Sequence, residues 1–313
     1  LTAKDFRCSF SQFMTIPSIA IFTDDPGWHG KQLKQAFASL GFQSAFVSLS
    51  ECCFHLSKQH ALPISIPQFE KTLPLAAFVR GVPGGSLEEV TLYLDFLHGL
   101  KILGIPVYND AHAIERSVDK AMTSFLLHHA KLSTPKTWVL RSRTDALNLA
   151  RDELAAGNLL ISKPLFGSQG EGIRRIEKLT DIPWMTSSHG VYYLQRFIDC
   201  TGEGFSDYRV FVINGQAIAT MRRRGKSWLN NVAKGARCER VALNLEMNEL
   251  AINATKLLKM DYAGVDIIED CHGQFNVIEV NSVPAWKGLE TVFDGNIAQL
   301  LAQDLINRHL LKK

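Results

Sequence analysis

The sequence predicts a mixed α/β (α+β) protein made of three consecutive parts. In the first part, strands alternate with helices, which is typical of a small parallel sheet. After residue 112, helices and strands lead into a glycine-rich turn, and after residue 190 strands predominate. We therefore expect an N-terminal α/β domain over residues 15–112, followed by two α+β subdomains over residues 113–190 and 191–313.

Short apolar runs, interrupted by glycine and proline, define the elements of the N-terminal domain. We expect strands at residues 16–24, 42–49, 75–80 and 105–109, and helices at residues 31–40 and 87–103. Arg80 ends one of these strands, where open α/β sheets expose their ligand sites. Arg80 is therefore a candidate for holding an acidic substrate, although a surface arginine before a turn gives the same pattern.

The two later parts are richer in strands. We expect helices at residues 113–131, 144–155, 245–259 and 297–310, and strands at residues 137–140, 159–164, 191–197, 208–213, 217–222, 264–267 and 277–282. Asn214-Gly215, between two of these strands, is a strong signal for a tight hairpin turn.

Composition and charge argue against several classes of protein. Of the 313 residues, 46% are hydrophobic and 21% charged, as is usual for a globular protein. The net charge of +3 is too small to indicate nucleic-acid binding, and no apolar run reaches the roughly 18 residues that span a bilayer. The six cysteines lack metal-binding spacing, and the first residues lack the order of a secretory signal. We expect a cytoplasmic protein with reduced thiols.

Two late strands carry side chains with oxygen donors. Residues two apart on a strand point to the same face, so Glu279 and Asn281 can converge, and Asp266 can meet them from the neighbouring strand. Carboxylate and amide oxygens without His or Cys suit Mg²⁺, which commonly bridges protein carboxylates to nucleotide phosphates. A solvated strand end is the alternative explanation for each of these residues.

A glycine-rich turn follows the strand that ends near Lys163, with the sequence Lys-Pro-Leu-Phe-Gly-Ser-Gln-Gly-Glu-Gly over residues 163–172. Glycines let backbone N–H groups approach phosphate oxygens closely, and Lys163 adds a positive charge. The segment matches neither a Walker A loop nor a dinucleotide-binding fingerprint. By itself it is equally consistent with a flexible surface hairpin.

A basic polar stretch follows a later strand, with three arginines at residues 222–224 and then Asn231 and Lys234. Such donors can bind phosphoryl oxygens and a substrate carboxylate, or else an anionic polymer. By composition alone, Lys120 reads as a solvated lysine inside a helix, and residues 195–198 read as an ordinary buried strand.

The order of these segments resembles the ATP-grasp superfamily and, more closely, the RimK-type α-L-glutamate ligases. The order is a lysine, a second lysine with a glycine-rich loop, an apolar strand, a basic stretch, an aspartate and a Glu-x-Asn motif. The resemblance covers most of the chain and is strongest in residues 113–135, 163–172 and 264–289. It implies an ATP-grasp fold in which the two α+β subdomains sandwich ATP.

The resemblance also implies roles for individual residues. The lysines that hold the ATP phosphates correspond to Lys120 and Lys163, and the loop that closes over them to Gly167, Ser168, Gln169, Gly170 and Gly172. The adenine-binding hinge corresponds to Gln195, Arg196, Phe197 and Ile198, and the ribose-contacting acid to Asp207. The Mg²⁺ ligands, for which two ions are expected and Mn²⁺ is an alternative, correspond to Asp266, Glu279 and Asn281.

Further positions are implied near the reacting groups. Arg223 and Asn231 match positions beside the transferred phosphate, and Arg80 and Lys234 are candidates for contacting the substrate. The chain departs from the family at Leu229, where an arginine is common, so Arg222, Arg224 or Lys234 would have to compensate. It also departs at Arg196, where many members have Glu, which leaves a backbone contact to adenine but removes a side-chain contact.

The activity that the resemblance implies is ATP-dependent ligation of a carboxylate to an amine through an acyl-phosphate. Residues 80–88 and 281–289 look similar to the branch that adds glutamate to tetrahydromethanopterin-type cofactors. Glutamate addition to a protein C-terminus or another small acid, a different ATP-grasp reaction, and a non-catalytic nucleotide- or polyanion-binding module are the alternatives. We expect a small-molecule acid and L-glutamate as partners, without nucleic acid or membrane, and the family allows a homo-oligomer.

Overall fold

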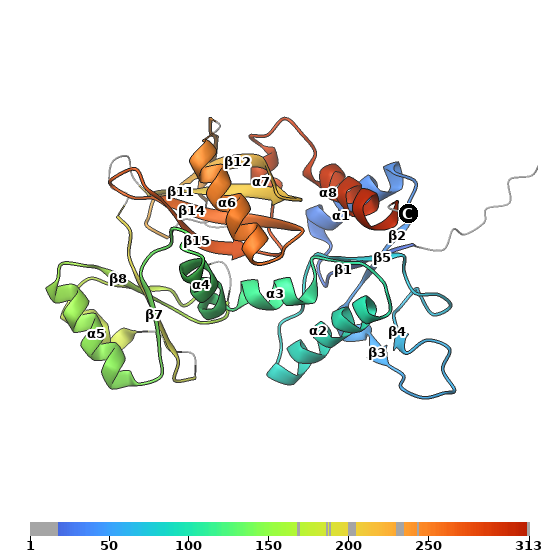
Figure 1. Cartoon of the computed structure of the whole chain (residues 1–313), viewed down its shortest axis with the longest axis horizontal. Coiled ribbons are helices and arrows are strands. Elements are labelled where there is room, and N and C mark those ends of the chain that lie inside the picture. The colour runs from blue at the N-terminus through green and yellow to red at the C-terminus, as the bar shows by residue number, and fades with distance from the viewer. Residues whose placement is uncertain are drawn as a thin grey trace, which may run out of the picture.

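The computed structural model describes residues 18–167, 170–185, 187, 189–199, 205–229, 235–242 and 244–311. The molecule is elongated and contains three main sheets, with the C-terminal sheet lying between the other two (Figure 1). Four residues that the sequence predicts for the site lie outside the described residues: Ser168, Gln169, Asn231 and Lys234.

The N-terminal sheet is parallel, as the alternation of strands and helices predicts. Its strands run in the order β2-β1-β5-β6. All residues of β1 and β5 are buried, because helices cover both faces of such a sheet. The elements are β1 Ile19–Phe22, α1 Gly27–Ser39, β2 Ser44–Val47, β3 Cys53–Phe54, β4 Ile64–Ser65, β5 Ala76–Val79, α2 Leu87–Ile102 and β6 Val107–Tyr108.

The central sheet is antiparallel and runs in the order β7-β10-β8-β9. Because β10 pairs with β7 and β8, the two antiparallel sheets divide between Arg196 and Ser206, later than the predicted boundary between residues 190 and 191. The elements are β7 Thr137–Leu140, α5 Arg143–Ala155, β8 Leu160–Lys163, β9 Arg174–Ile176 and β10 Tyr192–Arg196.

The C-terminal sheet is also antiparallel and runs in the order β13-β12-β11-β14-β15. Asn214 and Gly215 join β11 to β12 with positive φ at both positions, which confirms the predicted hairpin. The elements are β11 Ser206–Ile213, β12 Gln216–Arg224, β13 Arg237–Arg240, α6 Leu245–Leu257, β14 Tyr262–Glu269, β15 Phe275–Asn281, α7 Lys287–Glu290 and α8 Ile297–Leu305.

The single helix predicted over residues 113–131 is in fact two helices, α3 Ala111–Val118 and α4 Lys120–His129. Asp119 between them has an extended backbone, and its Oδ1 accepts hydrogen bonds from the N–H groups of Ala121 and Met122. Asp is a preferred residue for capping a helix in this way, so it starts a new helix rather than continuing the old one. Lys120 is therefore the first residue of α4 and not an interior helical lysine.

The buried core joins the first and last parts of the chain. One hydrophobic cluster combines residues of the N-terminal sheet with residues of β11, β14 and α8, and α8 lies beside α1 (Figure 1). The central sheet has its own cluster, formed with α5.

A fully buried asparagine, Asn109, reinforces this junction. Its Oδ1 accepts from the N–H groups of Asp261 (2.7 Å) and Tyr262 (3.2 Å). Its Nδ2 donates to the carbonyls of Tyr262 (2.7 Å) and Ser282 (2.8 Å). The beginning of β14 and the segment after β15 are thus attached to the end of β6.

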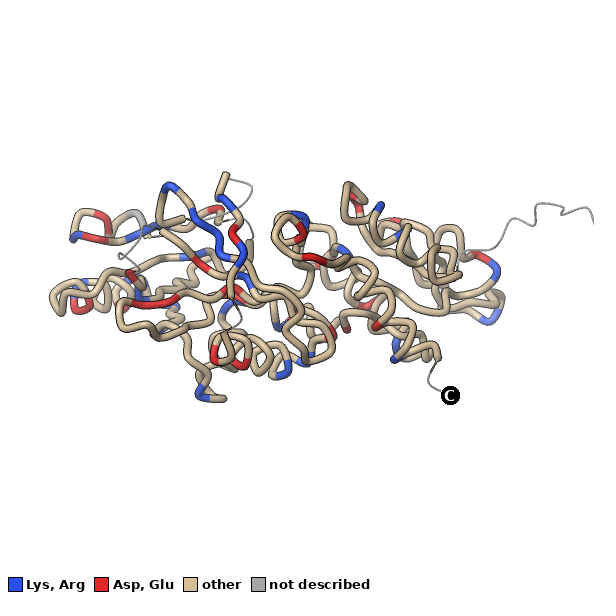
Figure 2. The backbone as a smooth tube through the Cα atoms, turned by 90° about the horizontal axis from the view of Figure 1, so that it is seen from above, with Lys and Arg blue, Asp and Glu red and all other residues tan. Residues whose placement is uncertain are grey.

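Both signs of charge are spread along the whole molecule (Figure 2). The longest basic stretches lie in the half that holds the two antiparallel sheets, where Arg222 to Arg224 end β12. Within the described part of the chain, every helix is too short or too polar to span a bilayer.

Candidate active site

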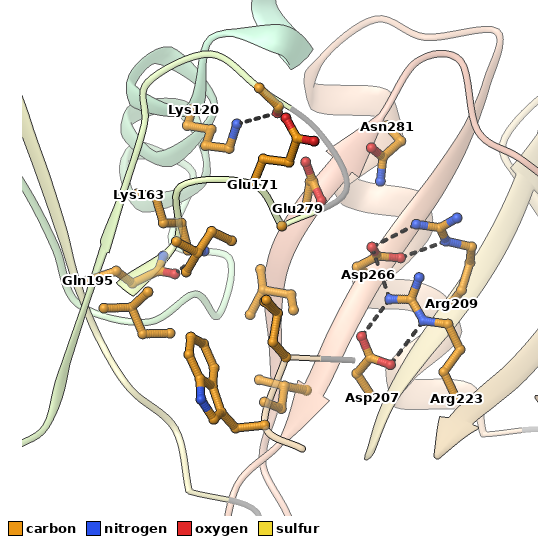
Figure 3. A pocket seen from close by; sticks show the side chains of 18 of the residues that line it. Lys120, Lys163, Glu171, Gln195, Asp207, Arg209, Arg223, Asp266, Glu279 and Asn281 are labelled. Carbon is orange, nitrogen blue, oxygen red and sulfur yellow. Dashed lines mark hydrogen bonds and ion pairs between the residues drawn. The ribbon is translucent and has the colours of Figure 1, made fainter. Parts of the chain in front are cut away.

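A cleft of about 590 Å³ is lined by residues of the central and C-terminal sheets and reaches Arg80 of the N-terminal domain. Figure 3 shows lysines on one side of this cleft and a group of arginines and carboxylates on the other. Of the predicted site residues that the structure describes, all except Gly172 line it: Arg80, Lys120, Lys163, Gly167, Gly170, Gln195, Arg196, Phe197, Ile198, Asp207, Arg223, Asp266, Glu279 and Asn281. The roles assigned to them stay predictions.

Lys163 ends β8 and is 9% exposed. Its Nζ donates to Oε1 of Gln195 at 2.7 Å, from the neighbouring strand β10. Burial lowers the pKa of Lys163 to about 8, an effect that Lys120 reinforces and Glu279 opposes. The ammonium group is therefore held by a neutral amide, and its charge is available to an anion.

Lys120 reaches the same space from the start of α4. Its Nζ donates to the carbonyl of Gly167 at 2.9 Å, so it contacts the glycine-rich loop directly (Figure 3). Burial lowers the pKa of Lys120 as well, although Glu279 and Asp119 oppose the shift. Gly167 has a φ of 134°, a conformation that favours glycine, which explains why this loop position lacks a side chain.

The opposite side of the cleft is a network of two arginines and two aspartates, which we call the arginine–aspartate network: Arg209, Arg223, Asp207 and Asp266. Arg209 binds Asp266 with two hydrogen bonds of 2.7 and 2.8 Å. Arg223 binds Asp207 with two hydrogen bonds of 2.9 and 2.5 Å and contacts Asp266 at 3.0 Å. The register explains the pairs, because Arg209 lies opposite Asp266 and Asp207 opposite Arg223.

Burial and charge act in opposite directions in this network. Burial alone would raise the pKa of Asp266, but the guanidinium groups of Arg209 and Arg223 outweigh it and lower that pKa. Burial raises the pKa of Asp207 to about 6, against the opposing effect of Arg223. Asp207, which is predicted to contact ribose, is 6% exposed, and Arg223 donates a hydrogen bond to each of its carboxylate oxygens.

The residues predicted to bind Mg²⁺ share one face of the β14–β15 pair. Glu279 lies directly opposite Asp266, and Asn281 lies two residues further on, opposite Gly264. Carboxylate and amide oxygens suit Mg²⁺, so this donor set fits the ion. Both oxygens of Asp266 already accept from arginines, but a carboxylate has about four acceptor positions and can bind a cation at the same time.

Part of the cleft lining is apolar and suits a flat base. These apolar residues are Ile161, Phe197, Ile198, Trp228, Leu229, Ile268 and Ile278. The rings of Phe197 and Trp228 meet edge to face with centroids 6.0 Å apart, and the guanidinium of Arg175 lies 4.2 Å from the Phe197 centroid.

The predicted adenine-binding hinge is partly committed to other contacts. The side chain of Arg196 binds Glu153 through two hydrogen bonds of 2.6 and 3.1 Å. The N–H groups of Arg196 and Phe197 donate to the carbonyls of Lys136 and Leu159. A backbone contact between this segment and adenine would therefore have to use its other groups.

Leu229, the departure from the family pattern, packs against the glycine-rich loop. A Cβ added to Gly170 would lie 3.0 Å from Cδ1 of Leu229, so the loop approaches this side chain closely. Leu229 cannot replace the charge of an arginine, but Arg209 and Arg223 place two guanidinium groups on the same cleft.

Two residues at the site escaped the sequence reasoning. Arg209 could have been found, because it alternates with Asp207 on a strand and therefore points to the same face. His29 of α1 could not have been found, because its contacts lie far away in the sequence. Its Nε2 accepts hydrogen bonds from the backbone N–H groups of Trp286 (3.1 Å) and Lys287 (3.2 Å). His29 thereby fixes the segment that lines the cleft beside Arg80, and burial together with Arg80 and Lys287 lowers its pKa to about 4.

The fold and this site define an ATP-grasp ligase. The chain matches a solved structure of the ATP-grasp ligase PsnB complexed with a phosphomimetic variant of its minimal precursor, Mg and ADP. The TM-score is 0.72 at 20% sequence identity, and the match covers 93% of this chain and 98% of that chain. At 20% identity, this similarity shows that the two chains share a fold and nothing more.

The chain belongs to the RimK-like ATP-grasp domain family, which matches residues 117–305. A tetrahydromethanopterin:alpha-L-glutamate ligase from Methanococcus maripaludis is 33% identical over 237 residues, covering 74% of this chain and 78% of the relative. One from Methanocaldococcus jannaschii is 36% identical over 212 residues, covering 64% of this chain and 70% of the relative. The class of this protein is therefore that of an ATP-dependent, ADP-forming carbon–nitrogen ligase.

Proposed function

We propose that this ligase joins L-glutamate to a carboxylate of a tetrahydromethanopterin-type cofactor. The two relatives described above, which are named for this reaction, each cover about two thirds or more of the chain. The observation that carries the proposal is one cleft in which two lysines face an oxygen donor set of the kind that Mg²⁺ prefers. The cofactor carboxylate would be phosphorylated by ATP, and the glutamate amine would then displace phosphate to form an amide.

The cations of the cleft match the charge that develops in this reaction. A carboxylate is a poor electrophile until ATP converts it to an acyl-phosphate, and negative charge accumulates on the phosphoryl group as it moves. Lys120 and Lys163 would hold the phosphates from one side, and Arg209 and Arg223 would face the transferred group from the other. Mg²⁺, bound by Asp266, Glu279 and Asn281, would supply further neutralisation of the phosphate oxygens.

The end of the cleft at Arg80 suits an acidic substrate. The Nε of Arg80 is buried without a partner among the described residues, and its Nη1 donates to the carbonyl of Val283 at 3.4 Å. Arg209 and Lys287 line the same cleft. Arg80 also lines the cleft, where its guanidinium group would bind a substrate carboxylate through charge-assisted hydrogen bonds.

The glycine-rich loop gives the reaction protection from water. An acyl-phosphate hydrolyses when water reaches it, so a loop that closes over the cleft preserves the intermediate. Lys120 donates a hydrogen bond to the carbonyl of Gly167 in this loop. A lysine that binds phosphate and also contacts the loop would hold the loop over the bound nucleotide.

The test is a product assay with purified protein, Mg²⁺, ATP and L-glutamate. Tetrahydromethanopterin is compared with other small carboxylic acids and with a peptide that ends in a free carboxylate. We expect ADP release and a product heavier by one glutamyl residue with the pterin. Product with the peptide or another acid alone would overturn the pterin assignment. If the protein binds polyanions but releases no ADP from ATP with any of the acceptors, the non-catalytic alternative would be favoured.

If the pterin fails, cell extract incubated with the protein, ATP and isotopically labelled glutamate can reveal the acceptor. Mass spectrometry then identifies the compound that gains the label. Lys163→Ala protein, treated in the same way, controls for labelling by other ligases in the extract.

A further inference from the structure

A cluster of two histidines and a glutamate lies on α2 and α3, among residues that do not line the cleft: His98, His112 and Glu115. One ligand atom from each residue lies within 4.8 Å of the other two. Oε1 of Glu115 is 2.7 Å from Nε2 of His98, and Oε2 is 3.1 Å from Nδ1 of His112. The two imidazole centroids are 4.4 Å apart.

The sequence places these groups together for local reasons. His112 and Glu115 are three residues apart on α3 and therefore lie on the same helical face. His98 comes from α2, so the cluster connects two helices. Asp110 caps α3 through the N–H of His112 and also pairs with Lys101, so the charge of this lysine on α2 is partly offset.

We propose that this cluster binds one transition-metal ion of the zinc class. Two imidazole nitrogens and one carboxylate oxygen form a donor set typical of Zn²⁺, whereas Mg²⁺ avoids imidazole. Tetrahedral Zn²⁺ with bonds of about 2.0–2.1 Å places its ligands about 3.4 Å apart. The farthest ligand pair therefore needs to close by about 1.5 Å at most, and water can fill the fourth position beside His112, which is exposed.

The ion would join α2 to the helix that precedes Lys120. α3 runs directly into α4, whose first residue is the cleft lysine Lys120. Without metal, Glu115 connects the two histidines by hydrogen bonds. With metal, the same three side chains would hold the helices by coordination, which resists unfolding of this junction.

The test is a Co²⁺ titration of the full chain, followed by visible absorption, with excess Mg²⁺ present and nucleotide absent. Excess Mg²⁺ competes with Co²⁺ for the oxygen donors of the cleft, and Co²⁺ is a spectroscopic substitute for Zn²⁺. We expect one Co²⁺ per chain, with ligand-field bands, no thiolate charge-transfer band, and displacement by Zn²⁺. Zn²⁺ should also raise the unfolding temperature of the wild-type protein.

Variants decide whether these residues are the ligands. His112→Ala changes an exposed side chain, so it should fold, and it should weaken Co²⁺ binding at least about tenfold, as should Glu115→Gln. His128→Ala, which removes an exposed histidine of α4 outside the cluster, is the matched control and should bind Co²⁺ normally.

Two outcomes would overturn the proposal. Unchanged Co²⁺ affinity and unchanged stabilisation by Zn²⁺ in His112→Ala would show that the cluster is only a hydrogen-bonded bridge. A thiolate charge-transfer band that disappears in Cys53→Ser would place the metal at Cys53 and His55 instead, whose Sγ and Nε2 are 3.4 Å apart.

Discussion

The two sides of the cleft carry positive charge in different ways. On one side, Lys163 is held by the amide oxygen of Gln195 and Lys120 by the carbonyl of Gly167, both of which are neutral acceptors. On the other side, Arg209 and Arg223 are bound to the carboxylates of the arginine–aspartate network. The lysines keep a net charge for a ligand, whereas the charge of the arginines is compensated within the protein.

This difference predicts a division of labour. Ammonium groups that are shielded from water and hydrogen-bonded to neutral acceptors are costly to the folded protein and valuable to a bound phosphate. A buried network of paired charges is destabilising to break, because removal of one member leaves another uncompensated. We therefore expect the lysine side to affect catalysis more than stability, and the arginine–aspartate network to affect both.

The largest effect is expected from Lys163→Ala, which should reduce turnover by two or more decades, because it removes a charge that we propose to hold the ATP phosphates. ADP release with saturating ATP measures this loss. The unfolding midpoint in denaturant should stay close to that of the wild type, because the variant also removes a desolvated charge. Lys136→Ala, at a lysine whose side chain is 57% exposed, is the matched control and should be active. Near-normal turnover in Lys163→Ala would contradict the division of labour.

Asp207→Ala tests the stability of the opposite side. It leaves the buried Arg223 with only part of its charge compensated, so the free energy of unfolding should fall by about 3 kcal/mol or more. Chemical denaturation measures the loss. The double variant Asp207→Leu, Arg223→Met should be more stable than Asp207→Ala, because it removes both members of the pair. Equal or greater instability of the double variant would show that packing, not charge, dominates here.

The pH dependence of nucleotide binding should reveal the contribution of the lysine side of the cleft. The pKa of Lys163 is lowered to about 8 in the free protein, and phosphate binds the protonated form. ATP affinity should therefore weaken as pH rises above 8, by at most about tenfold per pH unit. Lys163→Arg, which stays charged, should flatten this profile if it binds ATP. A wild-type affinity that is constant between pH 7 and about 9.5 would contradict the predicted titration.

The smallest effect is expected at His29, which supports the acceptor end of the cleft. His29→Ala removes the acceptor of two backbone N–H groups and should cost about 1–2 kcal/mol of unfolding free energy. His29→Gln offers an amide oxygen in its place and should recover part of the loss. In activity assays, His29→Ala should raise KM for the acidic substrate more than it lowers kcat, because the residue positions the site without touching the reacting groups.

The pKa of His29 predicts its contribution to pH-dependent stability. It is lowered from 6.5 to about 4 in the folded protein, so between these pH values the unfolded chain binds more protons. The free energy of unfolding should therefore fall as pH decreases from about 6.5 to 4, and His29→Gln should reduce this slope. An identical slope in wild type and variant would contradict the assignment.

Much of the fold could be predicted from local patterns. The apolar runs, glycine stops and the Asn214-Gly215 turn placed most helices and strands, because these signals act over a few residues. The break at Asp119 was missed because an aspartate inside a helical pattern is compatible with either one helix or a capped second one. The assignment of β10 to the central sheet depends on which strands pair, and this information is not local.

The candidate site was predictable where spacing fixes geometry. Glu279 and Asn281 had to share a face, and their ordered combination with the two lysines supported the ATP-grasp resemblance. The pairing of Arg209 with Asp266 depends on strand register, and the contact between His29 and residues 286 and 287 joins distant parts of the chain. Such long-range contacts leave no periodic trace in a sequence.

The hydrogen bonds of Asn109 bear on how the cleft opens. They attach the β14–β15 pair, which carries Asp266 and Glu279, to the end of β6, and the shared hydrophobic cluster strengthens the same connection. The central sheet, with its separate cluster, lacks this tie among the described residues. Substrate entry should thus proceed by rotation of the central sheet, which carries Lys163, relative to a stationary body formed by the N-terminal and C-terminal sheets.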